Sequence, residues 1–207
     1  MTYKELIEEC KKRGFTLVDD NGKFSEYETW LKPKSEYGKS KLLNEMYASE
    51  LIKSNDLSMV GLRFFSVYGP FGRPDMAYYS FSKSIKENKA IGLNNRGNMY
   101  RDMTFIDDIV HGTLGAIDYL FNPKSKNKNE IFNLGNDGPI KTSYLIHKIE
   151  KFFGNKALIQ HYTTEDENMK THADITKAKN LLGYDPRISF DQGFERFLEW
   201  HKDYENI

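Results

Sequence analysis

The chain has 207 residues, of which 39% are hydrophobic and 14% aromatic, so it carries enough large apolar side chains to pack a globular core and is not disordered overall. Its 30 Lys and Arg residues balance its 30 Asp and Glu residues, which leaves no net field to favour nucleic acid or an anionic membrane as a partner. The single cysteine, Cys10, excludes an internal disulfide and a thiolate metal cluster, and no apolar stretch is long enough to span a bilayer, so we expect a cytoplasmic protein.

The first 54 residues alternate helical and strand patterns. A capping box, Thr2-x-x-Glu5, begins a predicted helix that Gly14 ends, and the short apolar run at 15–18 predicts a buried strand. A second helical pattern runs over about 33–54. We expect its packed side to be formed by Leu43, Met46, Tyr47 and Leu51.

A compact apolar segment at 59–65 predicts a second strand, which leads into a loop rich in glycine and proline at 68–74. Parallel strands need long crossovers such as these helices, so the order helix, strand, helix, strand predicts part of a doubly wound parallel sheet in residues 1–74. Beyond residue 74 the pattern changes to short strands and helices. This change predicts a smaller mixed α/β lobe over most of 75–207.

Within the second lobe, the sequence predicts helices at 75–88 and 107–121, an extended piece at 103–106 and a solvated surface loop at 121–129. Three further helices carry local start and stop signals. These signals are Thr142 and Asp174 as N-caps, Ser189-x-x-Gln192 as a capping box, and Gly154 and Gly183 at helix ends. The last helix is expected to bury Phe190, Phe194, Phe197 and Leu198.

Tyr37 and Lys41 stand four residues apart at the start of the second helix, so their side chains are expected to project from one face. An ammonium beside a phenol favours the phenolate, which can remove a proton from a hydroxyl group of a substrate. By itself the spacing is weak evidence, because an exposed helix rich in lysine produces it by chance.

Two other groups of polar residues are assigned structural roles. Asp107 and Asp108 precede an apolar helix, where carboxylates cap the helix and complement its dipole, so we assign them no catalysis. The five histidines show no spacing typical of zinc ligands, and we expect no metal site.

Five blocks, met in order along nearly the whole chain, carry a resemblance that no single block would support. They are Pro33-Lys34-Ser35-Glu36-Tyr37-Gly38-Lys39-Ser40-Lys41 with Asn44-Glu45, the run 62–76, Arg101-Asp102-Met103-Thr104-Phe105-Ile106-Asp107-Asp108, Phe132-Asn133-Leu134-Gly135 and Ala173-Asp174-x-x-Lys177-Ala178. The chain resembles the extended short-chain dehydrogenase/reductase family, which includes the NAD-dependent epimerases and dehydratases. The element Gly72-Arg73-Pro74-Asp75-Met76 is similar to that of the UDP-glucuronate 4-epimerases.

The resemblance implies that 1–74 is a remnant of a Rossmann-type sheet and that 75–207 is mostly a nucleotide-sugar-binding lobe. It also implies the 4-epimerisation of UDP-glucuronate and UDP-galacturonate, with NAD as the hydride acceptor, in sugar-nucleotide and surface polysaccharide metabolism. Tyr37 would then be the catalytic base, and Lys41 would activate it and hold the nicotinamide ribose.

The resemblance assigns four residues to the UDP-sugar. Ser66 and Arg73 stand where these epimerases hold the sugar carboxylate, with Ser66 replacing the more usual threonine. Arg101 stands where the family grips the diphosphate, a role that suits a planar, permanently charged guanidinium, and Glu167 replaces an aspartate that contacts the nucleotide. The alternative for Arg101 is an ion pair with Asp107 or Asp108, the two aspartates at the start of the predicted helix 107–121.

The sequence also departs from the family. None of its glycine pairs, at 69 and 72, 112 and 115, or 135 and 138, is the glycine-rich turn that brings a backbone to a pyrophosphate, and the serine-rich stretch expected after the strand at 15–18 is absent. We therefore expect a chain that lacks the family's front half and does not turn over alone.

Three interpretations stay open. The first is a truncated or split epimerase that a separate chain completes, the second a non-catalytic nucleotide-sugar binding or interaction module, and the third a relative of the dehydratases or reductases. By resemblance we also expect a homodimer through the Tyr37 helix.

Overall fold

In the computed structural model, the described residues are 23–26, 33, 35–55, 57–125, 129–163 and 168–205. The predicted first helix and the strand at 15–18 lie outside them. The elements are α2 (Glu36–Asn55), β1 (Met59–Phe64), β2 (Val67–Tyr68), α3 (Ala77–Lys86), β3 (Ala90–Asn94), the 3-10 turn η1 (Asn95–Gly97), β4 (Tyr100–Asp102), β5 (Thr104–Phe105), α4 (Ile106–Phe121), β6 (Asn129–Leu134), β7 (Pro139–Lys141), α5 (Thr142–Phe153), β8 (Leu158–Tyr162), α6 (Thr176–Leu182) and α7 (Phe190–Glu205).

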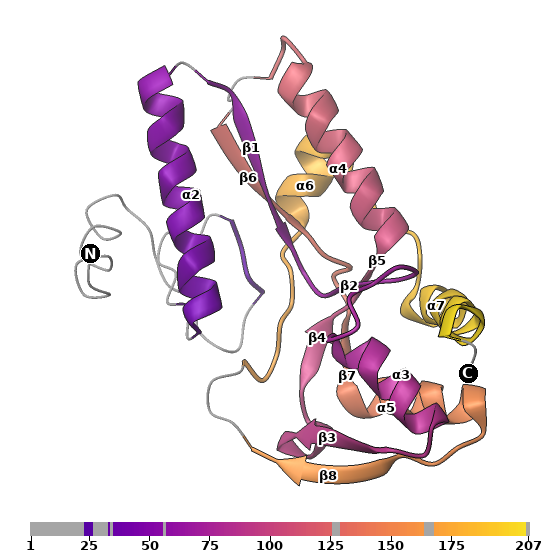
Figure 1. The fold of residues 1–207 in the computed structure, drawn as a ribbon. Coiled ribbons are helices and arrows are strands. Elements are labelled where there is room, and N and C mark those ends of the chain that lie inside the picture. The colour runs from indigo at the N-terminus through magenta and orange to yellow at the C-terminus, as the bar shows by residue number, and fades with distance from the viewer. Residues whose placement is uncertain are drawn as a thin grey trace.

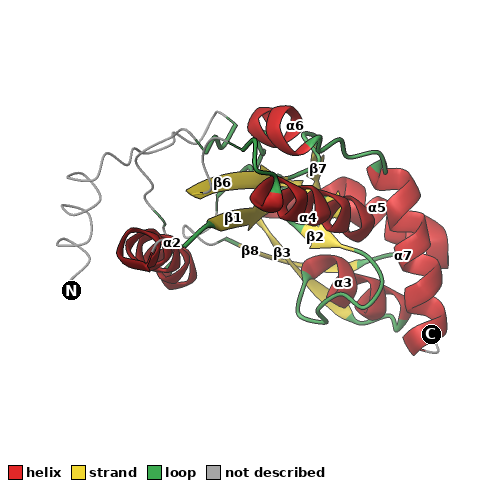
Figure 2. Cartoon of the chain, turned by 90° about the horizontal axis from the view of Figure 1, so that it is seen from above, coloured by secondary structure: helices red, strands yellow, loops and turns green. Residues whose placement is uncertain are grey.

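Helices cover both faces of a parallel strand pair in the upper part of the molecule. β1 and β6 run parallel, in a register that pairs Met59 with Asn129 and Phe64 with Leu134. α2 lies on one side of this pair, and α4 and α6 lie on the other (Figures 1 and 2). A parallel sheet with helices on both faces is the doubly wound arrangement that the sequence predicts, so the predicted fold class is confirmed.

The lower part of the molecule is a mixed lobe. β3 pairs with β8 in parallel, β4 pairs with β7 antiparallel, and α3 and α5 pack against each other beside them (Figure 1). The short parallel pair of β2 and β5 lies where the two parts meet. Two helix ends are as predicted, since Gly154 after α5 and Gly183 after α6 are both left-handed, with φ of 74° and 65°.

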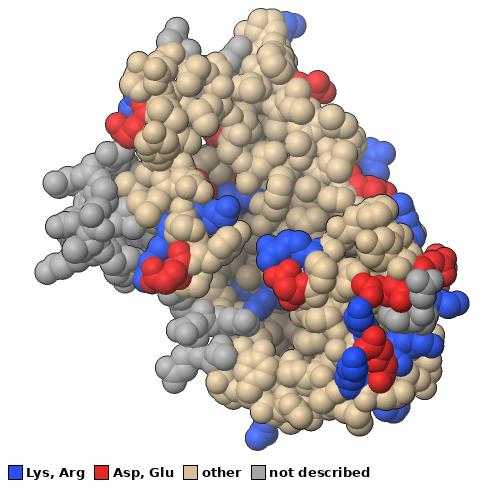
Figure 3. All heavy atoms as spheres, viewed as in Figure 1, with Lys and Arg blue, Asp and Glu red and all other residues tan. Residues whose placement is uncertain are grey.

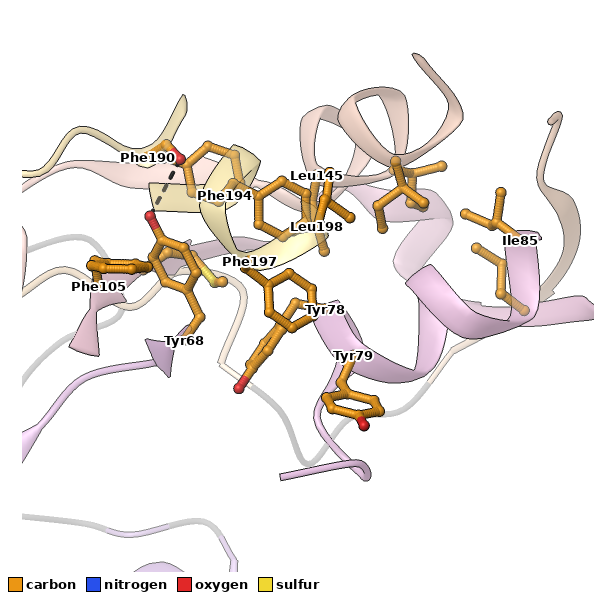
Figure 4. Packing of buried hydrophobic residues seen from close by; sticks show 14 of the residues in the cluster. Tyr68, Tyr78, Tyr79, Ile85, Phe105, Leu145, Phe190, Phe194, Phe197 and Leu198 are labelled. Carbon is orange, nitrogen blue, oxygen red and sulfur yellow. Dashed lines mark hydrogen bonds between the residues drawn. The ribbon is translucent and has the colours of Figure 1, made fainter. Parts of the chain in front are cut away.

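Aromatic side chains make up seven of the fifteen buried residues in the core of the lower lobe (Figure 4). The Tyr68 ring packs edge-on against Phe105 at 5.5 Å, and its hydroxyl donates to the carbonyl oxygen of Phe190 at 3.2 Å. Phe190 and Phe194 stack at 4.9 Å on the buried face of α7. Such pairs add about 0.5–1.5 kcal/mol each beyond the area that they bury, so α7 is a main stabilising element of the lobe.

The starts of the helices confirm some predictions and correct others. Ser189 and Gln192 form the predicted capping box, because the Gln192 N–H donates to the Ser189 hydroxyl at 3.4 Å and the Ser189 N–H to the Gln192 side chain at 3.2 Å. Asp174 accepts the Thr176 N–H at 3.0 Å, as a cap would. The Thr142 prediction is wrong, since this hydroxyl donates to a distant carbonyl in the segment before β4.

Predictions for four other residues are also corrected, in whole or in part. Asp107 and Asp108 lie in the first turn of α4, where they complement the helix dipole as predicted, but they do not cap the helix. Asp107 pairs with Arg196, and Asp108 accepts backbone N–H groups from the segment before α7. In α2 the buried residues are Leu42 and Met46, whereas two residues predicted to face inward, Leu43 and Tyr47, are 42% and 69% exposed. No helix in the described part of the chain is long and apolar enough to cross a membrane.

Candidate functional site

Tyr37 and Lys41 project from the same face of α2, as predicted. The Lys41 ammonium lies 5.4 Å from the centroid of the Tyr37 ring, and the Tyr37 side chain is exposed. Local bonds set the start of the helix, because the Gly38 N–H donates to the Ser35 hydroxyl at 3.1 Å and the Lys39 N–H to the Ser35 carbonyl at 3.0 Å. The serine thus fixes the turn that presents Tyr37.

An ion pair fastens α2 to the sheet. Arg63 in β1 donates through Nε and Nη2 to the two carboxylate oxygens of Glu45, both at 2.8 Å, and the pair is partly buried. Bidentate pairs fix geometry better than single contacts do. The first turn of α2 lies on the side toward which β1 runs, so Tyr37 is near the carboxyl end of a parallel strand (Figure 1). Ligands of doubly wound sheets bind at this edge.

Ser66 lies between β1 and β2 and joins the two parts of the molecule. Its carbonyl accepts the Thr104 N–H at 3.0 Å, and the preceding Phe65 N–H donates to Leu134 at the end of β6. These backbone bonds hold the half-buried Ser66 at the carboxyl ends of β1 and β6. The residue that sequence reasoning assigns to a sugar carboxylate is therefore at the sheet edge where Tyr37 begins its helix.

The turn that follows β2 is held from two sides. On one side, the Tyr78 hydroxyl fills the space beside Gly72, and a Cβ added to Gly72 would lie 1.9 Å from that hydroxyl. From outside, the exposed Phe71 ring contacts Trp200 at 5.1 Å and Tyr204 at 6.2 Å on α7. Phe71 has a φ of 60°, a left-handed conformation that a bulky residue seldom adopts without support from its surroundings.

Arg73 leaves this turn and binds a neighbouring carboxylate. Its Nε donates to Asp75 Oδ1 at 3.0 Å and its Nη2 to Asp75 Oδ2 at 2.5 Å, and both side chains are largely exposed. This bond raises the pKa of the Arg73 guanidinium, and the phenols of Tyr37 and Tyr78 add smaller shifts in the same direction.

Figure 3 shows this face with all atoms drawn. It is hollowed between the side of α2 and the lower lobe, and Lys and Arg side chains lie around the hollow. A second, shallow pocket lies between α3 and the end of α7, lined by Tyr79, Lys83 and Glu205 among others. None of the residues predicted from sequence lines that pocket, so we place the candidate site at the hollow.

Arg101 in β4 is directed toward the segment that follows β8. Its Nη1 donates to the carbonyl oxygens of Tyr100 at 3.0 Å and of Asn168 at 2.8 Å. The alternative of an ion pair with the following aspartates is not what the structure shows, because those carboxylates bind Arg196 and backbone N–H groups. Glu167 lies outside the described residues.

Sequence reasoning missed the polar contacts that tie the segment 23–26 to the lobe. The Phe24 N–H donates to the His172 carbonyl at 2.8 Å, and the Asn133 N–H donates to the Glu26 carboxylate at 2.6 Å. His172 also binds Asp137 at 2.9 Å. The family block Phe132-Asn133-Leu134-Gly135 marks Asn133 as a residue of interest. Nothing in the sequence, however, pairs Asn133 with Glu26, which lies 107 positions earlier.

Comparisons with known proteins identify the family of the chain. A family model described as the NAD dependent epimerase/dehydratase family matches residues 16–135. The chain belongs to this family.

Two relatives and one solved structure illustrate the likeness. An uncharacterized protein of Methanocaldococcus jannaschii is 43% identical over 178 residues, which cover 86% of this chain and 53% of that protein. UDP-glucuronate 4-epimerase 3 of Arabidopsis thaliana is 37% identical over 195 residues, which cover 88% of this chain and 45% of that protein. The crystal structure of UDP-glucuronic acid 4-epimerase from Bacillus cereus, in complex with UDP-glucuronic acid and NAD, matches with a TM-score of 0.82 at 33% identity, over 90% of this chain and 58% of that one. The chain thus spans about half the length of the curated relatives it matches.

The epimerase/dehydratase family uses NAD, but the described glycines do not fit a dinucleotide. The space beside Gly72 holds the Tyr78 hydroxyl, a Cβ added to Gly112 would lie 2.8 Å from the Leu134 side chain of β6, and a Cβ added to Gly135 would lie 2.4 Å from Ala173. Each pair is thus filled at one or both of its glycines by the chain's own packing, and none of these glycines opens a helix after a strand. The described residues therefore provide no backbone cradle for the pyrophosphate of NAD. Among them, no group of three His, Cys, Asp or Glu side chains could hold a metal ion either.

Proposed function

We propose that this member of the epimerase/dehydratase family carries the sugar-nucleotide side of a UDP-uronate 4-epimerase site. The observation that carries the proposal is that two exposed groups, the Tyr37 phenol with the Lys41 ammonium over its ring and the Arg73 guanidinium, stand at the start of α2 and in the turn after β2. A uronate offers each of them a suitable partner, a hydroxyl for the phenol and a carboxylate for the guanidinium. The similarity to UDP-glucuronate 4-epimerases supports the same substrate class.

In this proposal each site residue has a role in binding or proton transfer. Arg73 and Ser66 hold the uronate carboxylate, and Arg101 and Glu167 contact the UDP portion. Tyr37 exchanges a proton with the 4-hydroxyl, and Lys41 places its positive charge over the tyrosine ring. The substrates would be UDP-glucuronate and UDP-galacturonate, used in sugar-nucleotide and surface polysaccharide metabolism.

We propose a domain boundary near residue 74. Residues 1–74 contribute the Tyr37 helix, and residues 75–207 contribute most of the contacts to the sugar nucleotide. The described residues support binding and proton transfer and do not seat NAD. A separate chain that supplies the dinucleotide-binding part is one way to complete the enzyme. From the cysteine content we also propose a cytoplasmic location.

A non-catalytic nucleotide-sugar binding module is the second candidate. It is favoured by the filled glycine pairs, which leave the described residues without a place for the hydride acceptor. A dehydratase or reductase relative is less well supported, because Arg73 suits a carboxylate that the sugars of those enzymes need not carry.

Isothermal titration calorimetry tests the proposal. The wild type should bind UDP-glucuronate, and Arg73→Ala should weaken that binding by about ten- to a hundredfold, the loss expected for one charge-assisted contact. Binding of UDP-glucose should change little, because a neutral sugar does not use the charge.

Arg196→Ala is the matched control, since Arg196 is also an exposed arginine paired with an aspartate, on α7. It should bind both ligands as the wild type does. Equal losses for both sugars in Arg73→Ala, or no binding of either UDP-sugar to folded wild type, would contradict the proposal.

A further inference from the structure

The site that we assign to a uronate already holds a carboxylate, that of Asp75. The two oxygens of Asp75 accept from Nε and Nη2 of Arg73, in the side-by-side geometry with which a guanidinium receives a carboxylate ligand. The residue comes from the same turn, two positions away, so it is always present at high effective concentration. A uronate that reaches Arg73 meets this resident carboxylate first.

The pair is strong enough to be populated and weak enough to be displaced. The bond to Arg73 holds the pKa of the Asp75 carboxyl below its usual value, so the residue is an anion at neutral pH. The side chains of Arg73 and Asp75 are 73% and 63% exposed, and exposed ion pairs contribute little net stability because water solvates both partners. Two carboxylates at one guanidinium also repel each other. Asp75 therefore opposes a charged sugar ligand and has no such effect on a neutral one.

The turn around Arg73 does not depend on this carboxylate. The Met76 N–H donates to the Arg73 carbonyl at 3.2 Å, and the Gly72 N–H to the Gly69 carbonyl at 3.3 Å. Tyr78 below the turn and the α7 rings outside it fasten the same backbone. Removing the charge of Asp75 should thus release the Arg73 guanidinium while the backbone of the turn keeps its conformation.

Resting on the proposed function of Arg73, we propose that Asp75 is a specificity-determining residue, an internal competitor that a uronate carboxylate must displace from Arg73. It sets how tightly the site binds charged sugars relative to neutral ones. A UDP-uronate binds by exchanging one carboxylate for another at the same guanidinium, whereas a UDP-hexose leaves the Arg73–Asp75 pair intact.

Calorimetry with UDP-glucuronate and UDP-glucose tests the competition on four proteins: wild type, Asp75→Asn, Asp75→Glu and Asp107→Asn. Asp75→Asn should bind UDP-glucuronate about two- to fivefold more tightly, the range that an exposed ion pair accounts for, with UDP-glucose unchanged. Asp75→Glu keeps the charge and should behave as the wild type. Asp107→Asn removes the same charge from the exposed Asp107–Arg196 pair, and it should leave both affinities unchanged.

A second readout detects the displacement itself. In ¹⁵N NMR spectra, the Arg73 Nε–H signals of free wild type and free Asp75→Asn should differ, because only the wild type has the Asp75 bond, and saturating UDP-glucuronate should bring the two signals together, because both proteins then hold the ligand carboxylate. Weaker uronate binding by Asp75→Asn, or an equal gain for both sugars, would overturn the competitor role. If the wild type binds neither UDP-sugar, the proposed function of the site fails, and the role of Asp75 fails with it. Binding by the wild type without tightening in Asp75→Asn refutes this inference alone.

Discussion

At the scale of single residues, the two arginines that the family blocks assign to the UDP-sugar, Arg73 and Arg101, have different surroundings. Arg73 is exposed and bound to a carboxylate within its own turn, whereas Arg101 is half-buried and donates to backbone carbonyls. The sequence singles out both through the family blocks. The sequence does not predict the contact between Arg73 and Asp75. The turn that brings these two residues together packs against nearby Tyr78 and against α7, which lies more than a hundred residues further along the chain.

His201 predicts a pH dependence of stability that belongs to one residue. Its Nδ1 lies 2.9 Å from the Ser82 hydroxyl, and its Nε2 is buried without a partner among the described residues. Burial lowers the pKa of His201 below its usual 6.5, opposed by the Glu205 carboxylate and aided by the Lys83 ammonium. Because the folded pKa is depressed, this residue's contribution is complete above about pH 6.5 and is lost as the pH falls toward the folded pKa.

Urea unfolding from pH 7 to pH 5 checks this prediction. The free energy of unfolding of the wild type should fall more steeply than that of His201→Gln, which does not titrate, by up to about 1.4 kcal/mol per pH unit. His111→Gln, at an exposed histidine, is the control and should follow the wild type. Parallel profiles for wild type and His201→Gln would show that His201 does not carry the effect.

At the scale of elements, predictions held where the deciding residues lie within one element and failed where a distant contact decides. α7 was predictable because both its capping box and its buried phenylalanines are encoded within one helix. Thr142 was misassigned because its hydroxyl finds the Met99 carbonyl, 43 residues away. α2 carries apolar residues around its circumference, so only its contact with β1 decides that Leu42 and Met46 face inward.

The outward face of α2 predicts self-association through this helix, which remains a proposal from the family resemblance. Leu43 and Tyr47 are one turn apart and are 42% and 69% exposed. Burying side chains of this size contributes about 1.5–3 kcal/mol each, so Leu43→Glu with Tyr47→Glu should weaken a dimer at least about tenfold in sedimentation equilibrium. Leu114→Glu, at an exposed leucine of α4 on the other side of the sheet, should leave the association unchanged. An unchanged association constant in the double variant would exclude α2 as the contact.

At the scale of the whole molecule, the fold class followed from the order of helices and strands, and the family blocks located the candidate site. The relation between the two parts could not be predicted, because it rests on long-range contacts. β6 comes from beyond residue 74 and completes the pair with β1, and the segment 23–26 bridges to His172 and Asp174. These contacts explain why the candidate site lies between the parts.

The filled glycine pairs predict how the chain responds to NAD. Adding NAD at millimolar concentration should leave the melting temperature of the purified chain unchanged, because a ligand stabilises a protein only through a site formed in the native state. UDP-glucuronate should raise the melting temperature in the same assay. A saturable rise with NAD would show that the chain forms a dinucleotide site after all.

The central claim is that a UDP-uronate binds at the hollow between α2 and the turn after β2. A crystal structure of the chain with UDP-glucuronate tests it most directly. The account predicts the uronate carboxylate on Arg73, with Asp75 displaced, the sugar 4-hydroxyl within hydrogen-bond reach of the Tyr37 phenol, and the diphosphate near Arg101. A ligand bound elsewhere, for example in the pocket between α3 and α7, or a uronate ring turned away from Tyr37 and Arg73, would contradict it.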